Sequence, residues 1–175
     1  SFIDLLYDLQ EKTTLNSRQI NILIELDFFE EFGDTNLLLA QYDLFSYFYG
    51  KKQLRKDYLD KIGVPYELVR ACAEKESEKM FTKVDMHKFL VIAAKCLTPK
   101  RRTLKERIAA QVKHLGYIDI ADERYSGMMA VLDVNTKYAP RLKMHSLMNG
   151  NTIEVKIDKR TFNSNKLQVG DIIRV

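Results

Sequence analysis

The 175-residue chain lacks several features that would place it in a familiar class of protein. No apolar run is long enough to cross a membrane, and two acids within the first ten residues argue against a signal peptide. Cysteine is scarce, with only Cys72 and Cys96, both among helix-forming residues. We expect them to pack as small apolar groups without a disulfide, which fits a reducing cytoplasm. The serine at position 1 suggests a piece of a longer protein.

Motifs for metal binding and catalysis are also missing. The three histidines are far apart and have no cysteine or acid at ligand spacing, which argues against a metal site. There is no glycine-rich phosphate loop and no serine, histidine and acid arrangement. Asp119 and Asp122 fall on opposite faces of an expected strand, and Asp133 has no evident partner, so they are poor joint ligands for paired Mg²⁺ ions. The sequence predicts no cofactor and no catalytic residue in this chain.

Basic residues are rare at the start of the chain and frequent afterwards. The first fifty residues hold two basic side chains and nine acidic ones, whereas the remainder holds 26 basic and 15 acidic side chains. We therefore expect any phosphate-binding surface in the later part of the chain.

Apolar residues at helical spacing dominate the first two thirds. Helices are predicted over residues 1–10, over 16–26 with an Asn16–Gln19 capping box, and over 37–49. Gly33 suits a left-handed residue ending the turn between the last two. Residues 51–97 are predicted to be helical, with Asp85 as a cap and the charge run at 73–79 as a solvated helix surface. Thr103 and Glu106 form a second capping box, and Gly116 ends that helix.

From residue 117 the apolar period changes to two. Residues 117–122 and 128–134 are predicted strands, Leu142–Ile157 is predicted to be a hairpin turning at Asn149-Gly150, and 171–175 is the closing strand. The predicted fold class is α+β: a helical N-terminal part with a helix-hairpin-helix, then a small five-stranded OB-like β-barrel. The predicted domains are 1–50 (helix-hairpin-helix), 51–114 (helical connector) and 115–175 (OB-like, nucleic-acid-binding).

The segment NSRQINILIELDFFEEFGDTNLLLA resembles a helix-hairpin-helix of the bacterial DNA polymerase III alpha subunit, the C-family replicative polymerase. The matching residues are Asn16, Arg18, Ile20, Leu23, Ile24, Phe29 and Gly33. Leu26-Asp27 replaces the small Ala-Gly of the family's turn. Without that glycine, and with acids nearby, the hairpin is expected to be mainly structural.

The resemblance covers about residues 1–48 and 115–175, and the order of the parts agrees with the family. It implies a noncatalytic C-terminal portion of a cytoplasmic DNA-directed DNA polymerase, a nucleotidyltransferase of DNA replication. Its catalytic residues and Mg²⁺ would lie upstream of Ser1. The barrel would bind single-stranded template DNA. The family's helix between the third and fourth OB strands is not evident. An incomplete or merely OB-like barrel is therefore an alternative to a complete one. The alternatives are a protein-interaction module for the sliding clamp or loader, and a free-standing single-strand-binding protein.

Binding of single-stranded DNA needs cations for the backbone and aromatic faces for the bases. The KRR linker (Lys100, Arg101 and Arg102) could bind phosphates or be an ordinary solvated loop. Phe162 could instead fill the interior of the barrel. The predicted nucleic-acid-binding residues are Lys100, Arg101, Arg102, Tyr117, Tyr125, Lys137, Tyr138, Arg141, Lys143, His145, Lys156, Lys159, Arg160 and Phe162.

A second motif, QYDLF, resembles the peptide with which polymerase subunits bind the sliding clamp. Gln41 and Asp43 would supply polar contacts, and Leu44 and Phe45 would be apolar anchors. The same residues lie at helical spacing within a predicted helix. We therefore favour core packing over clamp binding.

Overall fold

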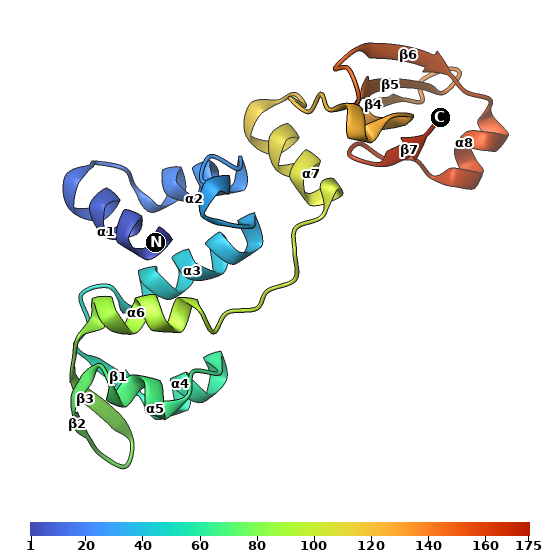
Figure 1. Ribbon diagram of the computed structural model, residues 1–175. Helices are drawn as coiled ribbons and strands as arrows, with labels where there is room; N and C mark the ends of the chain where they lie inside the picture. The colour runs from blue at the N-terminus through green and yellow to red at the C-terminus, as the bar shows by residue number, and fades with distance from the viewer. The chain divides into compact units, whose positions relative to one another are not determined.

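The computed structural model describes residues 1–175 and divides the chain into two compact units, Ser1–Arg102 and Thr103–Val175. Both helices and strands are present, which confirms the α+β class (Figure 1). The division at Arg102 puts residues 103–114, which the sequence analysis assigned to the connector, in the second unit. No helix has the length and apolarity that a membrane span requires.

The first unit is built around helix α3 (Thr35–Phe48), which packs against α1 (Phe2–Lys12), α2 (Ser17–Glu25) and α6 (Met86–Ala94). The predicted capping box of α2 is confirmed, since the Asn16 and Gln19 side chains each accept a hydrogen bond from the other's backbone N–H. Asp85 caps α6 as predicted. Apolar residues of these helices form one continuous core.

The connection between α2 and α3 contains a short 3₁₀ helix, η1 (Glu30–Phe32). Gly33 follows it with a positive φ of 145° but with extended ψ, so it is not the left-handed helical residue that was predicted. The left-handed residue is Asp27, with φ 63°. Aspartate adopts this conformation more readily than most residues because its short polar side chain can hydrogen-bond locally.

Residues 51–97 are not wholly helical, and that prediction is wrong. They contain a three-stranded antiparallel sheet in the order β1-β3-β2, formed by β1 (Gln53–Arg55), β2 (Ala73–Glu76) and β3 (Met80–Val84). Two short helices, α4 (Lys56–Ile62) and α5 (Tyr66–Arg70), lie between β1 and β2 in the chain. Helix α6 contacts α1, α3 and α5 and so joins the helices to this small sheet (Figure 1).

The charge run predicted as a helix surface is the β2–β3 hairpin. Glutamate and lysine favour a helix only weakly, and burial of Phe81 and Val84 in the central strand decides the conformation. The charged side chains of β2 stay exposed in the strand, as they would have been in a helix. The pattern of charged residues alone therefore does not distinguish a strand from a helix.

The second unit begins with α7 (Leu104–Leu115), whose Thr103–Glu106 capping box and left-handed Gly116 are both as predicted. A four-stranded antiparallel sheet in the order β6-β5-β4-β7 follows. Its strands are β4 (Met128–Asn135), β5 (Arg141–Ser146), β6 (Thr152–Lys156) and β7 (Ile172–Arg174). The sheet has four strands and does not close, so the prediction of a five-stranded barrel is wrong in strand number and closure.

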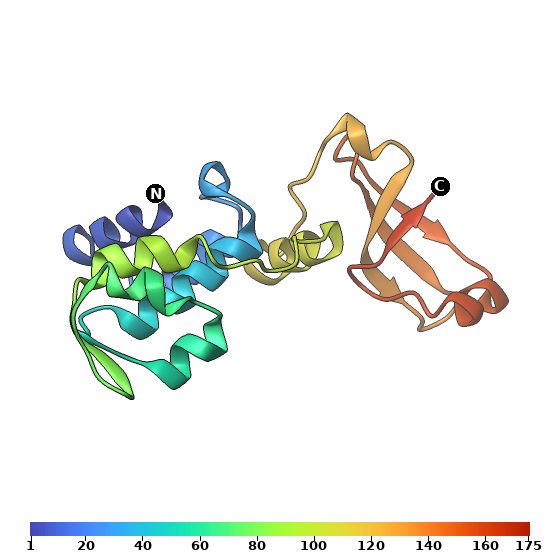
Figure 2. The same cartoon turned by 60° about the horizontal axis from the view of Figure 1, so that its bottom comes forward.

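Two apolar clusters cover the two faces of this sheet. Met129, Val131, Leu142 and Met144 form one cluster, against which Phe162 of α8 (Lys159–Asn165) packs. Ala130 and Leu147 form the other with Ile108 of α7 and two isoleucines of residues 117–122. Figure 2 shows the open strands, with α8 following β6. Lys159, Arg160 and Phe162, predicted above to bind nucleic acid, lie in α8, a helix that was not predicted from the sequence.

Residues 117–122 do not form the predicted strand. Ile118 and Ile120 do point inward at a period of two, but residues 117–122 form no ladder with a strand of the sheet. The backbone N–H of Asp119 donates to Gln111 Oε1 at 2.9 Å, and Ile120 O lies 2.9 Å from His145 Nε2. Side chains thus satisfy backbone groups that a neighbouring strand would otherwise have paired.

One buried ion pair fixes the end of the first unit to its helical hairpin. Arg102 Nη1 lies 2.6 Å from Asp27 Oδ1 and 3.1 Å from Thr35 Oγ1, and the Arg102 and Asp27 side chains are only 8% and 14% exposed. The Arg102 backbone N–H also donates to the Asp34 carboxylate at 3.2 Å, and Asn36 Nδ2 donates to Lys100 O at 3.0 Å. Residues 100–102 therefore lie along the N-terminus of α3.

We predict that Arg102→Ala destabilises the protein by roughly 3–5 kcal/mol, because it leaves the Asp27 carboxylate buried without its counter-charge. The measurement is the free energy of unfolding in urea at pH 7. Arg101→Ala is the matched control, since its side chain is 92% exposed, and it should change the free energy by less than about 0.5 kcal/mol. Equal effects of the two substitutions would contradict the assignment.

A second prediction concerns acid stability of the small sheet. Glu76 accepts hydrogen bonds from Arg70 Nε and Lys56 Nζ, each at 2.7 Å, and these bonds, that of Arg70 first, lower the pKa of its carboxyl to about 2. A lowered pKa stabilises the fold above the unfolded value of 4.5, and this contribution is lost as pH falls from there towards 2.

Glu76→Gln should therefore reduce the free energy of unfolding at pH 7, and its difference from the wild type should shrink between pH 4.5 and pH 2. Urea unfolding across that range measures the difference. Glu74→Gln on the same strand is the control, because Glu74 reaches only the exposed Lys83, at 3.2 Å. A difference independent of pH would refute the assignment.

Candidate nucleic-acid interface

The register of the second sheet brings several basic side chains onto one face. Arg141 and Lys143 share a face of β5, and Arg141 lies directly opposite Lys156 of β6. The β4–β5 connection, which carries Lys137 and Tyr138, enters β5 immediately before Arg141. We call these five residues the basic strip: Lys137, Tyr138, Arg141, Lys143 and Lys156.

The electrostatics of the basic strip favour an anion. Like charges directly opposite each other in a sheet are unfavourable, and Arg141 and Lys156 form such a pair. Arg141 Nη1 is partly neutralised by Glu154 Oε1 at 2.9 Å, whereas Lys143 and Lys156 have no carboxylate within ion-pair distance. The basic strip thus contains four cations and has two acids beside it. One is Glu154 of β6, and the other is Asp133 of β4, which pairs with Lys143. A surface with excess unpaired lysine attracts phosphate.

An exposed aromatic ring adjoins these cations. The side chain of Tyr138 is 79% exposed, and Lys137 Nζ lies 5.7 Å from the centre of its ring. Such a ring has a free face on which a base can stack, a contact worth roughly 1–3 kcal/mol per base.

The other half of the same face is covered. His145 continues the row of Arg141 and Lys143, but it is only 7% exposed and its Nε2 lies 2.9 Å from Ile120 O. The structure therefore contradicts the prediction that His145 is an exposed nucleic-acid-binding residue. Residues 118–120 and α7 cover this end of the sheet. An interface on this face is limited to the end near Arg141 and Lys156.

The remaining predicted residues are dispersed. Tyr117 is exposed, whereas Tyr125 packs against the cluster that includes Ile108. Phe162 packs against the other cluster, so its alternative role as an apolar plug matches its position, although no barrel closes around it. Lys159 and Arg160 are exposed in the first turn of α8, beside its N-cap Asp158. A hydrogen bond from the Thr161 side chain lowers the pKa of Asp158, so its negative charge offsets part of theirs.

In the KRR linker only two of the three cations are accessible. Lys100 and Arg101 are exposed, and Arg101 Nε lies 3.9 Å from Asp34 Oδ2. Arg102 is buried against Asp27, which leaves its guanidinium no free edge for a phosphate. The third residue of the KRR linker, Arg102, is thus packed into the first unit.

The QYDLF segment lies inside α3. Leu44 and Phe45 are buried in the core of the first unit, while Asp43 is exposed and Gln41 is half-buried. The two apolar anchors would reach a sliding clamp only if α3 opened. This arrangement is the core packing that the sequence analysis favoured.

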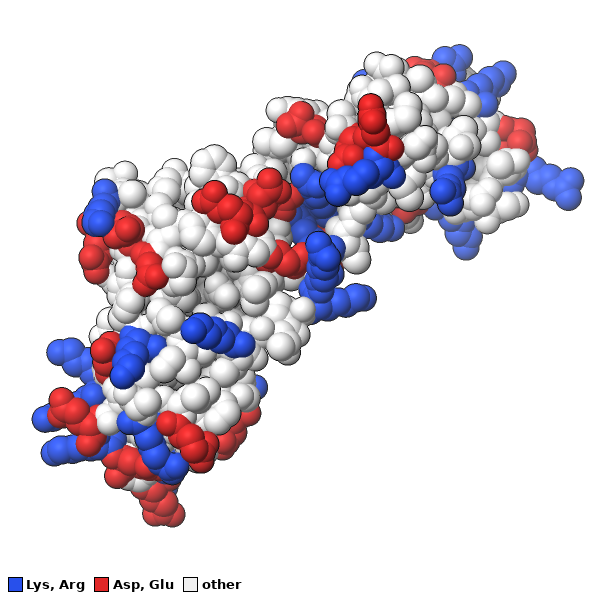
Figure 3. All heavy atoms as spheres, in the orientation of Figure 1, with Lys and Arg blue, Asp and Glu red and all other residues white.

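Figure 3 shows acidic side chains gathered over the first helices and basic ones projecting from the second unit. The second unit holds twelve basic and eight acidic residues, so its charge is positive as a whole. No cluster of three or more His, Cys, Asp or Glu side chains with the geometry of a metal site occurs in residues 1–175.

Sequence reasoning missed one group of aromatic and basic residues, Tyr47, Lys51 and Tyr58, which line a cavity in the first unit. The available signal was the segment YFYGKK, in which aromatic residues directly precede two lysines.

Comparison with known proteins places the chain in no family: no family model matches it, and neither a curated protein nor a solved structure resembles it significantly.

Proposed function

We propose that the chain binds single-stranded DNA through the basic strip of its second unit. The observation that carries this proposal is the row of Arg141, Lys143 and Lys156 on the open half of the sheet, with the exposed Tyr138 at its end. The cations neutralise phosphates without regard to sequence, and the tyrosine stacks on a base.

The parent protein that we propose is a bacterial DNA polymerase III alpha subunit, on the strength of the residue pattern at 16–40 and the order of the parts. In that setting α2 and α3 form the helix-hairpin-helix, and the sheet of the second unit serves as an OB-like domain for template strand in the cytoplasm. The polymerase chemistry and its Mg²⁺ belong to a region outside this chain. Other replisome subunits, including the sliding clamp, are proposed partners of the whole polymerase.

The helical hairpin is not proposed as a DNA contact. Its left-handed residue Asp27 directs a carboxylate to Arg102, and Glu30 and Glu31 follow closely. Negative side chains at this turn oppose the approach of phosphate.

We predict that the chain binds a fluorescein-labelled thymidine 15-mer weakly at low salt, and that binding weakens steeply as salt rises. Fluorescence anisotropy at about 50 mM and about 200 mM salt measures both effects. Lys143→Gln/Lys156→Gln should reduce the slope of log affinity against log salt by about 1.4, since about 0.7 is expected per lost single-strand contact. Tyr138→Ala should weaken binding about tenfold with the slope unchanged.

Lys75→Gln is the matched control, because Lys75 is an exposed strand lysine of the first unit. It should leave both the affinity and the salt slope as in the wild type. Absence of binding at low salt, or equal losses in the control and in the double variant, would overturn the proposal.

A further inference from the structure

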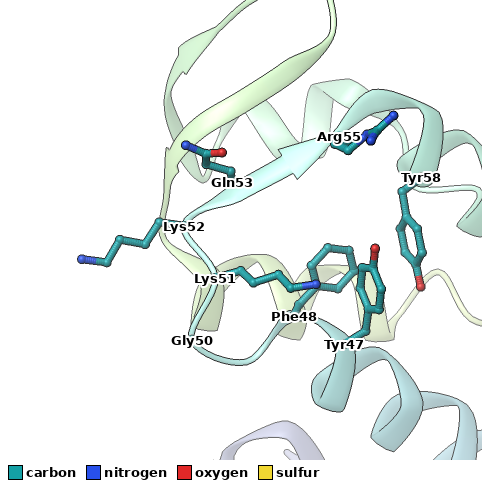
Figure 4. Close-up of a pocket in the computed structure, with 8 residues that line it drawn as sticks. All are labelled: Tyr47, Phe48, Gly50, Lys51, Lys52, Gln53, Arg55 and Tyr58. Atoms are coloured by element: carbon teal, nitrogen blue, oxygen red, sulfur yellow. The ribbon is translucent and has the colours of Figure 1, made fainter.

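The first unit contains a cavity of about 500 Å³ lined by aromatic and basic side chains. It lies where the end of α3 passes through Gly50 into the edge strand β1, with Tyr58 of α4 on the far side (Figure 4). Its volume is within the range of cavities that hold small molecules. None of its residues belongs to the basic strip.

The aromatic wall of the cavity is held rigid. The rings of Tyr47 and Tyr58 stack with their centres 4.4 Å apart and an angle of 3° between their planes. Both pack edge-on against Phe48, at 4.8 Å and 5.2 Å, and the buried Phe48 packs in turn on Phe89 at 5.3 Å. Tyr47, which is 46% exposed, is therefore held in place by Phe48 and Tyr58 and remains open to solvent on its other sides.

A lysine occupies the open face of this wall. Lys51 Nζ lies 3.5 Å from the centre of the Tyr47 ring, and Figure 4 shows that ring between the ammonium group and Tyr58. Neither Lys51 nor Lys52 has a carboxylate within ion-pair distance. Lys51 is on an exposed, flexible stem, so its ammonium can leave the ring when another flat group takes its place.

The charges around the cavity are predominantly positive. Lys51, Lys52 and Arg55 line it, and Arg55 is engaged by Asp57 through two hydrogen bonds at 3.1 Å and 2.8 Å. One further acid, Asp43, lies close enough to contribute, after burial and Tyr47, to the raised pKa of Tyr58. The two lysines remain available for an anion.

We infer that this cavity binds a nucleotide, with the base stacked on Tyr47 in place of the Lys51 ammonium and the phosphate bound by Lys51. An aromatic face and an unpaired ammonium group within one cavity match the two parts of such a ligand, and Lys52, whose side chain points away from the Tyr47 ring (Figure 4), adds positive charge at the cavity's edge. This site is separate from the basic strip and does not depend on the proposed function of the second unit.

The test is titration of the full chain with thymidine 5′-monophosphate, observed through the backbone amide signals of Gly50 and Gln53 in ¹H–¹⁵N spectra. We expect saturable shifts with a dissociation constant of about 1 mM or below. Thymidine alone and inorganic phosphate alone, as separate arms, should each bind at least about tenfold more weakly, because each supplies half of the contacts. Equal binding of phosphate alone would reduce the site to an anion site and overturn the assignment.

Variants of Tyr47 and of the two lysines test whether nucleotide binding depends on the aromatic wall and on the ammonium groups. Tyr47→Leu should weaken binding about tenfold, while Tyr47→Phe, which keeps the ring, should bind as the wild type does. Lys51→Gln/Lys52→Gln should weaken binding of the nucleotide at least about fivefold, whereas thymidine should bind at least as well as to the wild type, because the ammonium that occupies the Tyr47 ring is gone. Unchanged nucleotide binding in both Tyr47→Leu and the lysine variant would refute the inference.

Lys143→Gln/Lys156→Gln separates this site from the basic strip. It should impair binding of the 15-mer and leave the Gly50 shifts with the mononucleotide intact. Loss of both together would show that the mononucleotide had been read out at the wrong site, which would also overturn the inference.

Discussion

The buried pair of Asp27 and Arg102 is the interaction on which the C-terminal end of the first unit depends. It joins the turn after α2 to the last residue of the unit, 75 positions further along the chain. A guanidinium and a carboxylate removed from water stabilise the fold only while each retains the other, since either one alone would be a buried charge. The pair therefore specifies one path for residues 100–102 along the N-terminus of α3.

The path of residues 100–102 determines which of their basic side chains can reach a phosphate. A run of three basic residues is easily read as a phosphate-binding segment, yet the third of them is an internal counter-charge. The residues that the structure leaves unpaired, Lys143 and Lys156 in one unit and Lys51 and Lys52 in the other, are lysines with no carboxylate within ion-pair distance. Their availability for an anion is a property of the surrounding side chains.

The polar face of the second sheet shows how packing limits a surface. One strand carries Arg141, Lys143 and His145 on the same face, but the inward-pointing Ile118 and Ile120 cover only the His145 end. The imidazole then satisfies the carbonyl of Ile120, a group without a strand neighbour. Half of the polar face thus becomes core and half stays open.

The amino-acid sequence by itself determined the local features: the capping boxes at Asn16 and Thr103, the cap at Asp85, the helix end at Gly116, and strands β4 and β5. The caps follow from interactions within a few residues, and the two strands follow from an apolar period of two. Only the tertiary structure decided the rest: that the charge run at 73–79 pairs as strands, that residues 117–122 bond to side chains, and that Arg102 and His145 are buried. The burial of Arg102 and His145 depends on partners 75 and 25 positions away in the chain. The other two depend on packing of Phe81 and Ile118 into the cores of their units. Propensities of a few tenths of a kcal/mol per residue cannot outweigh such contacts.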